Sequence, residues 1–321
     1  MARPKVLYKY RHFNERTIDL LCRDLVYFAN PSTFNDPMDT QPRVEMDCDI
    51  RRMEQTIREM IQMRLLQEMK ANASKIRYSG PKTVEHIQRL VESLAERRLE
   101  ELQYYSSDPE AGDEMLAYRG LLERELEHEL LLQYDRGVLS LAKRFDCPLM
   151  WSHYGDQHRG ICIGYAVPSE VDAPEWAINL HEVNYGGSRC VKASAVAAMV
   201  LDNDPAARVC VDAAVLLQKA PDWQYEKEWR MLGKHGLLSP YPLEMSEIIF
   251  GMRCERPVMY TIVSALKGRE KQVSFFQMQE RFGTFELVVV DLDLDDLEAS
   301  YPHCDNALFD LIEDLEGKSQ T

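Results

Sequence analysis

The chain has 321 residues, of which 45% are hydrophobic and 28% charged, and its formal net charge is −15. We expect a globular cytoplasmic protein, because the start MARPKVLYKYRHF has no apolar run and no later stretch reaches the roughly 18 apolar residues that span a bilayer. The negative charge argues against nonspecific nucleic-acid binding, which usually needs a basic face. Eight cysteines without a CxxC pair favour free thiols over a disulfide framework.

The first 40 residues predict a strand, a helix and a second strand. KVLYKYRHF alternates with a period of two, and NERTIDLLCRD has helical spacing with Asn14 as its N-cap. LVYFA is a short β-prone run that leads into the turn-rich segment NPSTFNDPMD.

Residues 46–135 predict an inserted helical subdomain. Apolar residues repeat with helical spacing in three segments, which break at YSGPK and SSDPEAGD. The first stripe contains Met53, Ile57, Met60 and Ile61, the second runs from Val84 to Leu94, and the third from Leu116 to Leu130. The remaining positions are rich in Glu, Arg and Gln, so we expect the stripes to pack on one another, on a second copy or on a protein partner.

Short strands and helices alternate after Gly137. The strand-like runs are VLSLA, GICIGYAV, LHEVNYG, EWRML, EIIFG and FELVVVDLDL. The sequence therefore predicts an α+β fold, with a mixed or antiparallel sheet built from both ends of the chain. We divide it into a core domain (1–45 and 136–296), the inserted helical subdomain (46–135) and a C-terminal acidic helix and tail (297–321).

Several titratable and aromatic side chains gather in MWSHYGDQHRG, which we expect to be a loop. His153 and His158 could serve as acid, base or phosphate donor, since histidine titrates near neutral pH, or they could be structural. Tyr154 joins an apolar ring to a polar group. Cys147 and Cys162 flank the histidines, but the spacing matches no standard zinc pattern, so we predict no metal site.

The segment WQYEKEWRML carries two carboxylates and a guanidinium close together. If it is a strand, Glu226, Glu228 and Arg230 share one face. Such a group is costly to bury, so it is either a site that stabilises a developing cation and positions a hydroxyl, or a structural ion network.

Two further groups could complete a cleft. Asn35, Asp36 and Asp39 could bind a ribose or a metal, or they could close an Asx turn before Pro37. Lys9 and Arg11 share a face of the first strand, where they could meet an anionic group or simply face solvent.

The sequence resembles the DUF2971 family of bacterial proteins of unknown function. The matching pieces are LYKYRHF, LVYFANPSTFNDPMD, PLMWSHYGDQHRGICIGY, YEKEWRM and IIFG, in the family's order over most of residues 7 to 251 outside the insert.

The order of these elements is also similar to the ADP-ribosyltransferase-like fold. That resemblance implies NAD as cofactor or substrate and a catalytic carboxylate at Glu228 or Glu226. It also implies that Arg11 or His12 holds the nicotinamide ribose and that Tyr154 or Tyr165 stacks on the nicotinamide. The chain has Tyr-Lys-Tyr-Arg where the fold often has a histidine, and it lacks a clear Ser-Thr-Ser strand.

The sequence thus favours an enzyme that transfers ADP-ribose from NAD or cleaves NAD or a related nucleotide, in a toxin or phage-defence setting. The residues expected to be catalytic are Glu228, Glu226, His153 and Tyr154, and those expected to bind the nucleotide are Lys9, Arg11, Asn35, Asp36, His158 and Arg230. The alternatives are a non-catalytic sensor or interaction module of a defence system and a metal-dependent phosphoester hydrolase.

Overall fold

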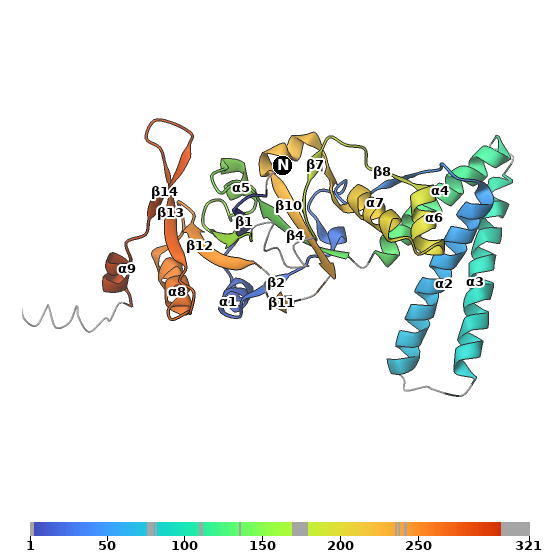
Figure 1. Ribbon diagram of the computed structural model, residues 1–321, viewed down its shortest axis with the longest axis horizontal. Helices are drawn as coiled ribbons and strands as arrows, with labels where there is room; N and C mark the ends of the chain where they lie inside the picture. Colours follow the sequence, from blue (N-terminus) through green and yellow to red (C-terminus); the bar gives the residue numbers. More distant parts are fainter. Residues whose placement is uncertain are drawn as a thin grey trace, which may run out of the picture.

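The computed structural model describes residues 3–75, 80, 82–108, 112–134, 136–168, 179–234, 236, 238–240 and 243–302. Its core is an eight-stranded sheet in the spatial order β14-β13-β12-β5-β1-β4-β10-β6 (Figure 1). The strands are β1 (Val6–Arg11), β4 (Arg136–Ala142), β5 (Ile161–Ala166), β6 (Leu180–Glu182), β10 (Glu228–Lys234), β12 (Glu244–Phe250), β13 (Ser274–Glu280) and β14 (Leu287–Asp291). All neighbours are antiparallel except β12 and β13, and strands from both ends of the chain contribute, so the predicted α+β class is confirmed.

Three small two-stranded pairs accompany this sheet. They are β2 (Leu25–Tyr27) with β11 (Leu238–Pro240), β3 (Arg43–Glu45) with β8 (Cys190–Lys192), and β7 (Asn184–Tyr185) with β9 (Gln218–Lys219). They link the main sheet to the loops that surround the site.

Helices cover both faces of the sheet. They are α1 (Glu15–Cys22), α5 (Pro148–His153), α6 (Ala193–Leu201), α7 (Pro205–Leu216), α8 (Arg256–Leu266) and α9 (Leu294–Ser300), with 3-10 turns η1 (Pro31–Thr33) and η5 (Pro221–Glu226). Asn14 caps α1 as predicted, because its side chain accepts from the Thr17 N–H. α1 and α8 pack on one face of β1 and β5, while Trp151 of α5 packs on the other.

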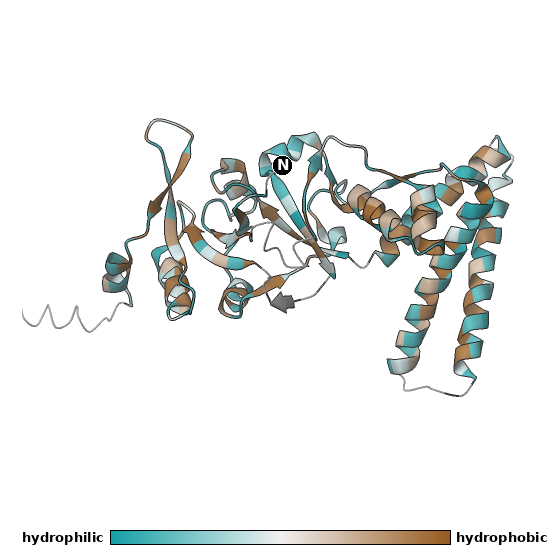
Figure 2. Cartoon of the chain, viewed as in Figure 1, coloured by the Kyte–Doolittle hydropathy of each residue, from teal (hydrophilic) through white to brown (hydrophobic). Residues whose placement is uncertain are grey.

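The insert forms three helices, α2 (Ile50–Lys75), α3 (Thr83–Ser106) and α4 (Glu114–Gln133). The predicted stripe of α2 is buried, but the second stripe is wrong at its start because Val84 and Leu90 are exposed. α2 and α3 run together away from the sheet, and apolar residues continue along both (Figures 1 and 2). Nearer the sheet, the core of the insert is continuous with residues of α6, α7, β4 and β10.

The main sheet forks between its two central strands. β1 pairs with β5 along its whole length, but within the described residues it pairs with β4 only at Tyr8 and Ala142. Further along β4, Val138 exchanges backbone hydrogen bonds with Ala29 in place of β1. The two prongs of this fork, β1 and β4, enclose a space in the middle of the sheet.

Two local expectations are corrected. WQYEKEWRML is not one strand, because η5 ends at Glu226, Lys227 turns through a left-handed conformation (φ 46°), and β10 begins at Glu228. The expected loop after Cys147 opens as helix α5, with Pro148 in its first turn. Most of the expected acidic tail, residues 297–321, lies outside the described residues, and α9 covers its first residues up to Ser300. None of the described helices is long and apolar enough to cross a membrane.

Candidate functional site

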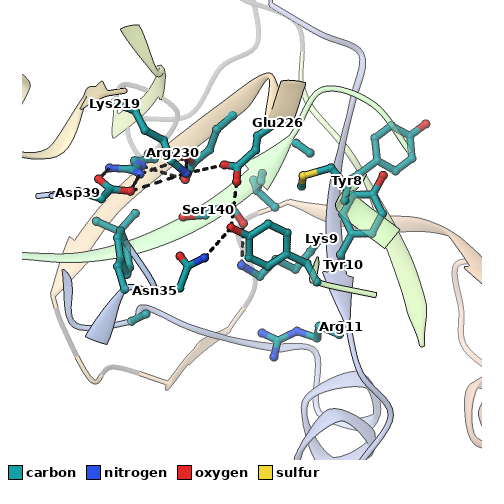
Figure 3. A pocket seen from close by; sticks show the side chains of 18 of the residues that line it. Tyr8, Lys9, Tyr10, Arg11, Asn35, Asp39, Ser140, Lys219, Glu226 and Arg230 are labelled. Carbon is teal, nitrogen blue, oxygen red and sulfur yellow. Dashed lines mark hydrogen bonds and ion pairs between the residues drawn. The ribbon is translucent and has the colours of Figure 1, made fainter. Parts of the chain in front are cut away.

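A cavity of about 390 Å³ lies in the fork of the sheet. Its walls come from β1, β4, the segment between β2 and β3, the end of α5, and β9 to β10 (Figure 3). The lining includes Tyr8, Lys9, Tyr10, Arg11, Tyr27, Phe34, Asn35, Asp39, Ser140, Tyr154, Lys219, Glu226, Glu228 and Arg230. Segments far apart in sequence therefore meet at one site.

Two cations line the cavity from β1. Lys9 and Arg11 come from alternate positions of the strand and point to the same side of it (Figure 3). Lys9 is half-buried, and its Nζ donates to the carbonyl of Ser140 at 2.8 Å. Burial and the nearby charge of Arg11 lower the pKa of Lys9 to about 8.

Arg230 is the centre of a buried ion network on the opposite wall. Its side chain is 0% exposed, and it grips both carboxylate oxygens of Asp39 at 3.0 and 2.6 Å. It also donates to Glu228 at 2.9 and 3.1 Å and to the carbonyl of Leu216 at 2.7 Å. All five N–H donors of the guanidinium are thus used within the protein, so Arg230 positions carboxylates and has no donor left for a phosphate.

Lys219 joins this network to a second glutamate. Its Nζ lies 2.5 Å from Glu226 and 3.0 Å from Glu228, with Asp39 at 3.7 Å. It also lies 5.1 Å from the ring centroid of Trp223. Because it has carboxylates around it, the pKa of Lys219 is raised in spite of its burial.

Glu226 connects the network to Tyr154 and the cavity. Its Oε1 accepts from the Tyr154 hydroxyl at 2.9 Å, and that hydroxyl accepts from the amide of Asn35 at 3.2 Å. In Figure 3 this chain of hydrogen bonds links Asn35 to Glu226. Within the described residues each carboxylate oxygen of Glu226 accepts one side-chain hydrogen bond, which leaves it a lone pair for a ligand.

The pKa values of Glu226 and Glu228 are shifted in opposite directions. Burial, together with the charge of Glu228, raises the pKa of Glu226 against the pull of Lys219. Burial also acts on Glu228, but there Arg230 and Lys219 prevail and its pKa is lowered. One carboxylate is therefore held ionised while the other can exchange a proton more readily, which is the division seen in acid–base pairs.

The structure brings together seven of the ten residues predicted for the site. These are Lys9, Arg11, Asn35, Tyr154, Glu226, Glu228 and Arg230. Where two candidates were open, Arg11 and Tyr154 line the cavity, whereas His12 and Tyr165 do not.

The other three predicted residues do not line the cavity. His153 is exposed at the end of α5, and His158 stacks on Trp151 with ring centroids 6.1 Å apart. Asp36 is buried, and its carboxylate accepts from the Trp223 indole at 2.8 Å and from the Met38 N–H at 2.8 Å. Asp36 thus forms the Asx turn that was the structural alternative, and it ties this turn to η5.

Sequence reasoning missed Lys219 and Trp223. Lys219 follows the helical run DAAVLLQ, and a lysine at the end of such a run is expected to face solvent. The available signal was compositional, because a lysine flanked by apolar residues needs carboxylate partners if it is buried.

These features define an α+β protein with a charged cavity in a forked sheet. A family model described as "Protein of unknown function (DUF2971)" matches residues 150–231. The resemblance to this family is therefore confirmed over that segment, which contains Tyr154, Lys219, Glu226, Glu228 and Arg230. No curated protein and no solved structure matches the chain.

Proposed function

We propose that this cavity binds NAD or a related nucleotide and that the protein is an ADP-ribosyltransferase-like enzyme that uses or cleaves it. One observation carries the proposal, namely the opposite charge of the two cavity walls. Asp39, Glu226 and Glu228 outnumber Lys219 and Arg230 on one wall, whereas Lys9 and Arg11 line the other.

This polarity matches the charges of NAD. The excess negative charge of the buried network suits a cationic pyridinium ring or a ribose that becomes cationic, and the cations of β1 suit a diphosphate. The aromatic rings of Tyr154 and Phe34 provide flat apolar surface for a base. The residues present therefore fit such a nucleotide.

When bound, the nucleotide supplies an N-glycosidic bond whose cleavage leaves positive charge on the ribose. Glu226 is the residue that we place against this charge and against a ribose hydroxyl, because it faces the cavity with free lone pairs. Tyr154 and Lys219 hold its two oxygens in place. Glu228 and Arg230 position Lys219 and the backbone of the site, and we assign them no direct contact with the reacting atoms.

The test compares binding and turnover in matched variants. Nicotinamide release from NAD, measured by chromatography, should fall at least about 100-fold in Glu226→Gln, as for the loss of one transition-state interaction. Lys9→Met should weaken binding of ADP-ribose measured by calorimetry, and Glu298→Gln, at an exposed ion pair of α9 outside the cavity, is the control. If NAD and ADP-ribose at millimolar concentration fail to raise the melting temperature of the wild type, the nucleotide proposal is wrong.

The site gives less support to a metal-dependent hydrolase. Among the described residues, no group of three or more His, Cys, Asp and Glu is placed to hold a metal ion. The carboxylates of the cavity are instead held by Lys219 and Arg230, which compete with a cation.

We place the proposed activity in the cytoplasm. A role in a toxin or in phage defence is also part of the proposal.

The insert favours a second role as an interaction surface. Where α3 ends and α4 begins, Tyr104, Tyr105, Met115 and Leu116 are all exposed, with Leu116 70% accessible. Exposed apolar clusters mark binding surfaces for proteins. Light scattering of the wild type and of Tyr104→Ser/Leu116→Ser tests self-association, and an unchanged monomeric mass in both would exclude it at the concentrations used.

A further inference from the structure

Two lysines line the cavity, and their surroundings differ sharply. Lys219 is held by three carboxylates at 2.5 to 3.7 Å. Lys9 forms no ion pair within the described part of the chain, and the hydrogen bond recorded for its Nζ is to the carbonyl of Ser140. A carbonyl can also accept a hydrogen bond from a neutral amine, so this contact does not require Lys9 to be an ammonium.

We propose that Lys9 captures a small anionic aldehyde or ketone reversibly through its side-chain nitrogen. The inference rests on the position of Lys9 at the cavity, on its lack of a carboxylate ion-pair partner among the described residues, and on the proton-transfer groups Tyr154 and Glu226 that line the same cavity. A lysine that is desolvated in a pocket and close to another cation is the kind that forms Schiff bases. The lowered pKa of Lys9 agrees with this assignment.

The reaction is a condensation that needs no oxidant or reductant. The neutral amine adds to the carbonyl carbon, and the carbonyl oxygen takes up a proton to give a carbinolamine. Loss of water then leaves a protonated C=N bond, so the lysine ammonium and the carbonyl compound yield an iminium ion and one water. Tyr154 and Glu226, which share a hydrogen bond at the same cavity, are the groups available to move these protons.

The rest of the cavity indicates the class of compound. Arg11 lies two residues from Lys9 on the same strand and on the same side of it, where a phosphate or carboxylate could meet its guanidinium (Figure 3). Phe34 adds aromatic surface. A volume of about 390 Å³ is enough for a compound the size of a sugar phosphate or a phosphorylated aromatic aldehyde.

The experiment traps the adduct on the full chain. We would treat the protein at pH 8 with pyridoxal 5′-phosphate at low excess, reduce with sodium borohydride, and map the modified lysines by peptide mass spectrometry. At this pH a lysine with a pKa near 8 is about half neutral, against well under 1% for an exposed lysine. We expect labelling of Lys9 at least about tenfold faster than of exposed Lys267 and Lys271.

Two variants and one internal comparison sharpen the result. Lys9→Met should lose the fast label, and Tyr154→Phe should slow it if the tyrosine transfers protons. Lys219 should stay unlabelled in every case. Labelling spread evenly over exposed lysines in the wild type overturns the proposal, and this mapping does not depend on whether Lys9→Met folds.

The inference goes beyond nucleotide binding and is tested without NAD. A protein that labels rapidly at Lys9 but neither binds nor cleaves NAD would refute the proposed function and keep this inference. Slow, unselective labelling of a protein that does cleave NAD would refute this inference and support the proposed function.

Discussion

The difference between Glu226 and Glu228 gives the sharpest test of the site. The two residues are separated only by Lys227, both are at most 4% exposed, and both contact Lys219. Their other partners differ, because Glu228 accepts two hydrogen bonds from Arg230 while Glu226 accepts one from Tyr154. The same conservative change at the two positions should therefore have unequal effects on stability.

In Glu228→Gln the new amide nitrogen faces N–H groups of Arg230 that now donate to the Glu228 carboxylate. Hydrogen bonds between charged partners contribute about 1.5 to 3 kcal/mol each, and three are affected, although one excess negative charge is also relieved. We expect a loss of about 3 kcal/mol in the free energy of unfolding. Glu226→Gln should cost less than about 1 kcal/mol, because burial already opposes the charge of Glu226 and because Lys219 keeps Glu228 and Asp39 as partners.

The dependence on pH has opposite signs for the two residues. The folded pKa of Glu228 is lowered, so its stabilising contribution is present above the unfolded value of about 4.3 and is lost as the pH falls through the folded pKa. The folded pKa of Glu226 is raised, so its carboxylate costs stability as the pH rises above about 4.3.

Urea unfolding of both variants at pH 7 and pH 4 measures these effects. The cost of Glu228→Gln should shrink at pH 4, and any gain from Glu226→Gln should appear at pH 7. Equal costs at the two positions at pH 7, or a larger cost for Glu226→Gln, would refute the division of roles between the carboxylates.

Three further predictions concern the surroundings of the site. Trp223→Phe removes the indole donor of Asp36 and should cost about 1 to 2 kcal/mol in urea unfolding, with a smaller effect only if the Asx turn holds without it. His158→Phe should leave the melting temperature equal or higher, because the buried Nδ1 has no partner among the described residues and the ring stacks on Trp151; a clear fall would show that this nitrogen is bonded. Replacing residues 50–133 by a short linker should abolish cooperative unfolding in calorimetry, because it exposes the apolar core that the insert shares with α6 and α7, and a sharp transition would show an independent core domain.

Local features of the fold were predictable because they depend on neighbours in sequence. Asn14 caps its helix, the stripe of α2 is buried, and β5 carries Ile161 and Ile163 into the main core. The stripe of α3 was wrong at its start because burial there depends on which helices lie alongside. Only tertiary contacts decide that Val91 is buried and Val84 is not.

The site was predictable in its membership but not in its division of labour. Polar residues near strand ends converge, as expected of a rigid scaffold, and most of those expected line the cavity. The sequence could not show that Arg230 is fully used within the protein, since Asp39 lies 191 residues away. It also could not show that Lys227 breaks the expected strand, because a left-handed lysine has no sequence signature.

The fork and the charged network depend on one another through Ser140. Across the ladder of β4 and β10, Ser140 faces Arg230, so the network fixes this part of β4 in place. Where the prongs diverge, the Ser140 carbonyl lacks the strand partner that a continuous sheet would give it, and a buried carbonyl without a donor is costly. Lys9 supplies that donor from β1. The divergence of β1 and β4 that opens the cavity therefore also leaves a carbonyl that Lys9 can satisfy. This hydrogen bond explains why a lysine without a carboxylate partner lies at the edge of the cavity.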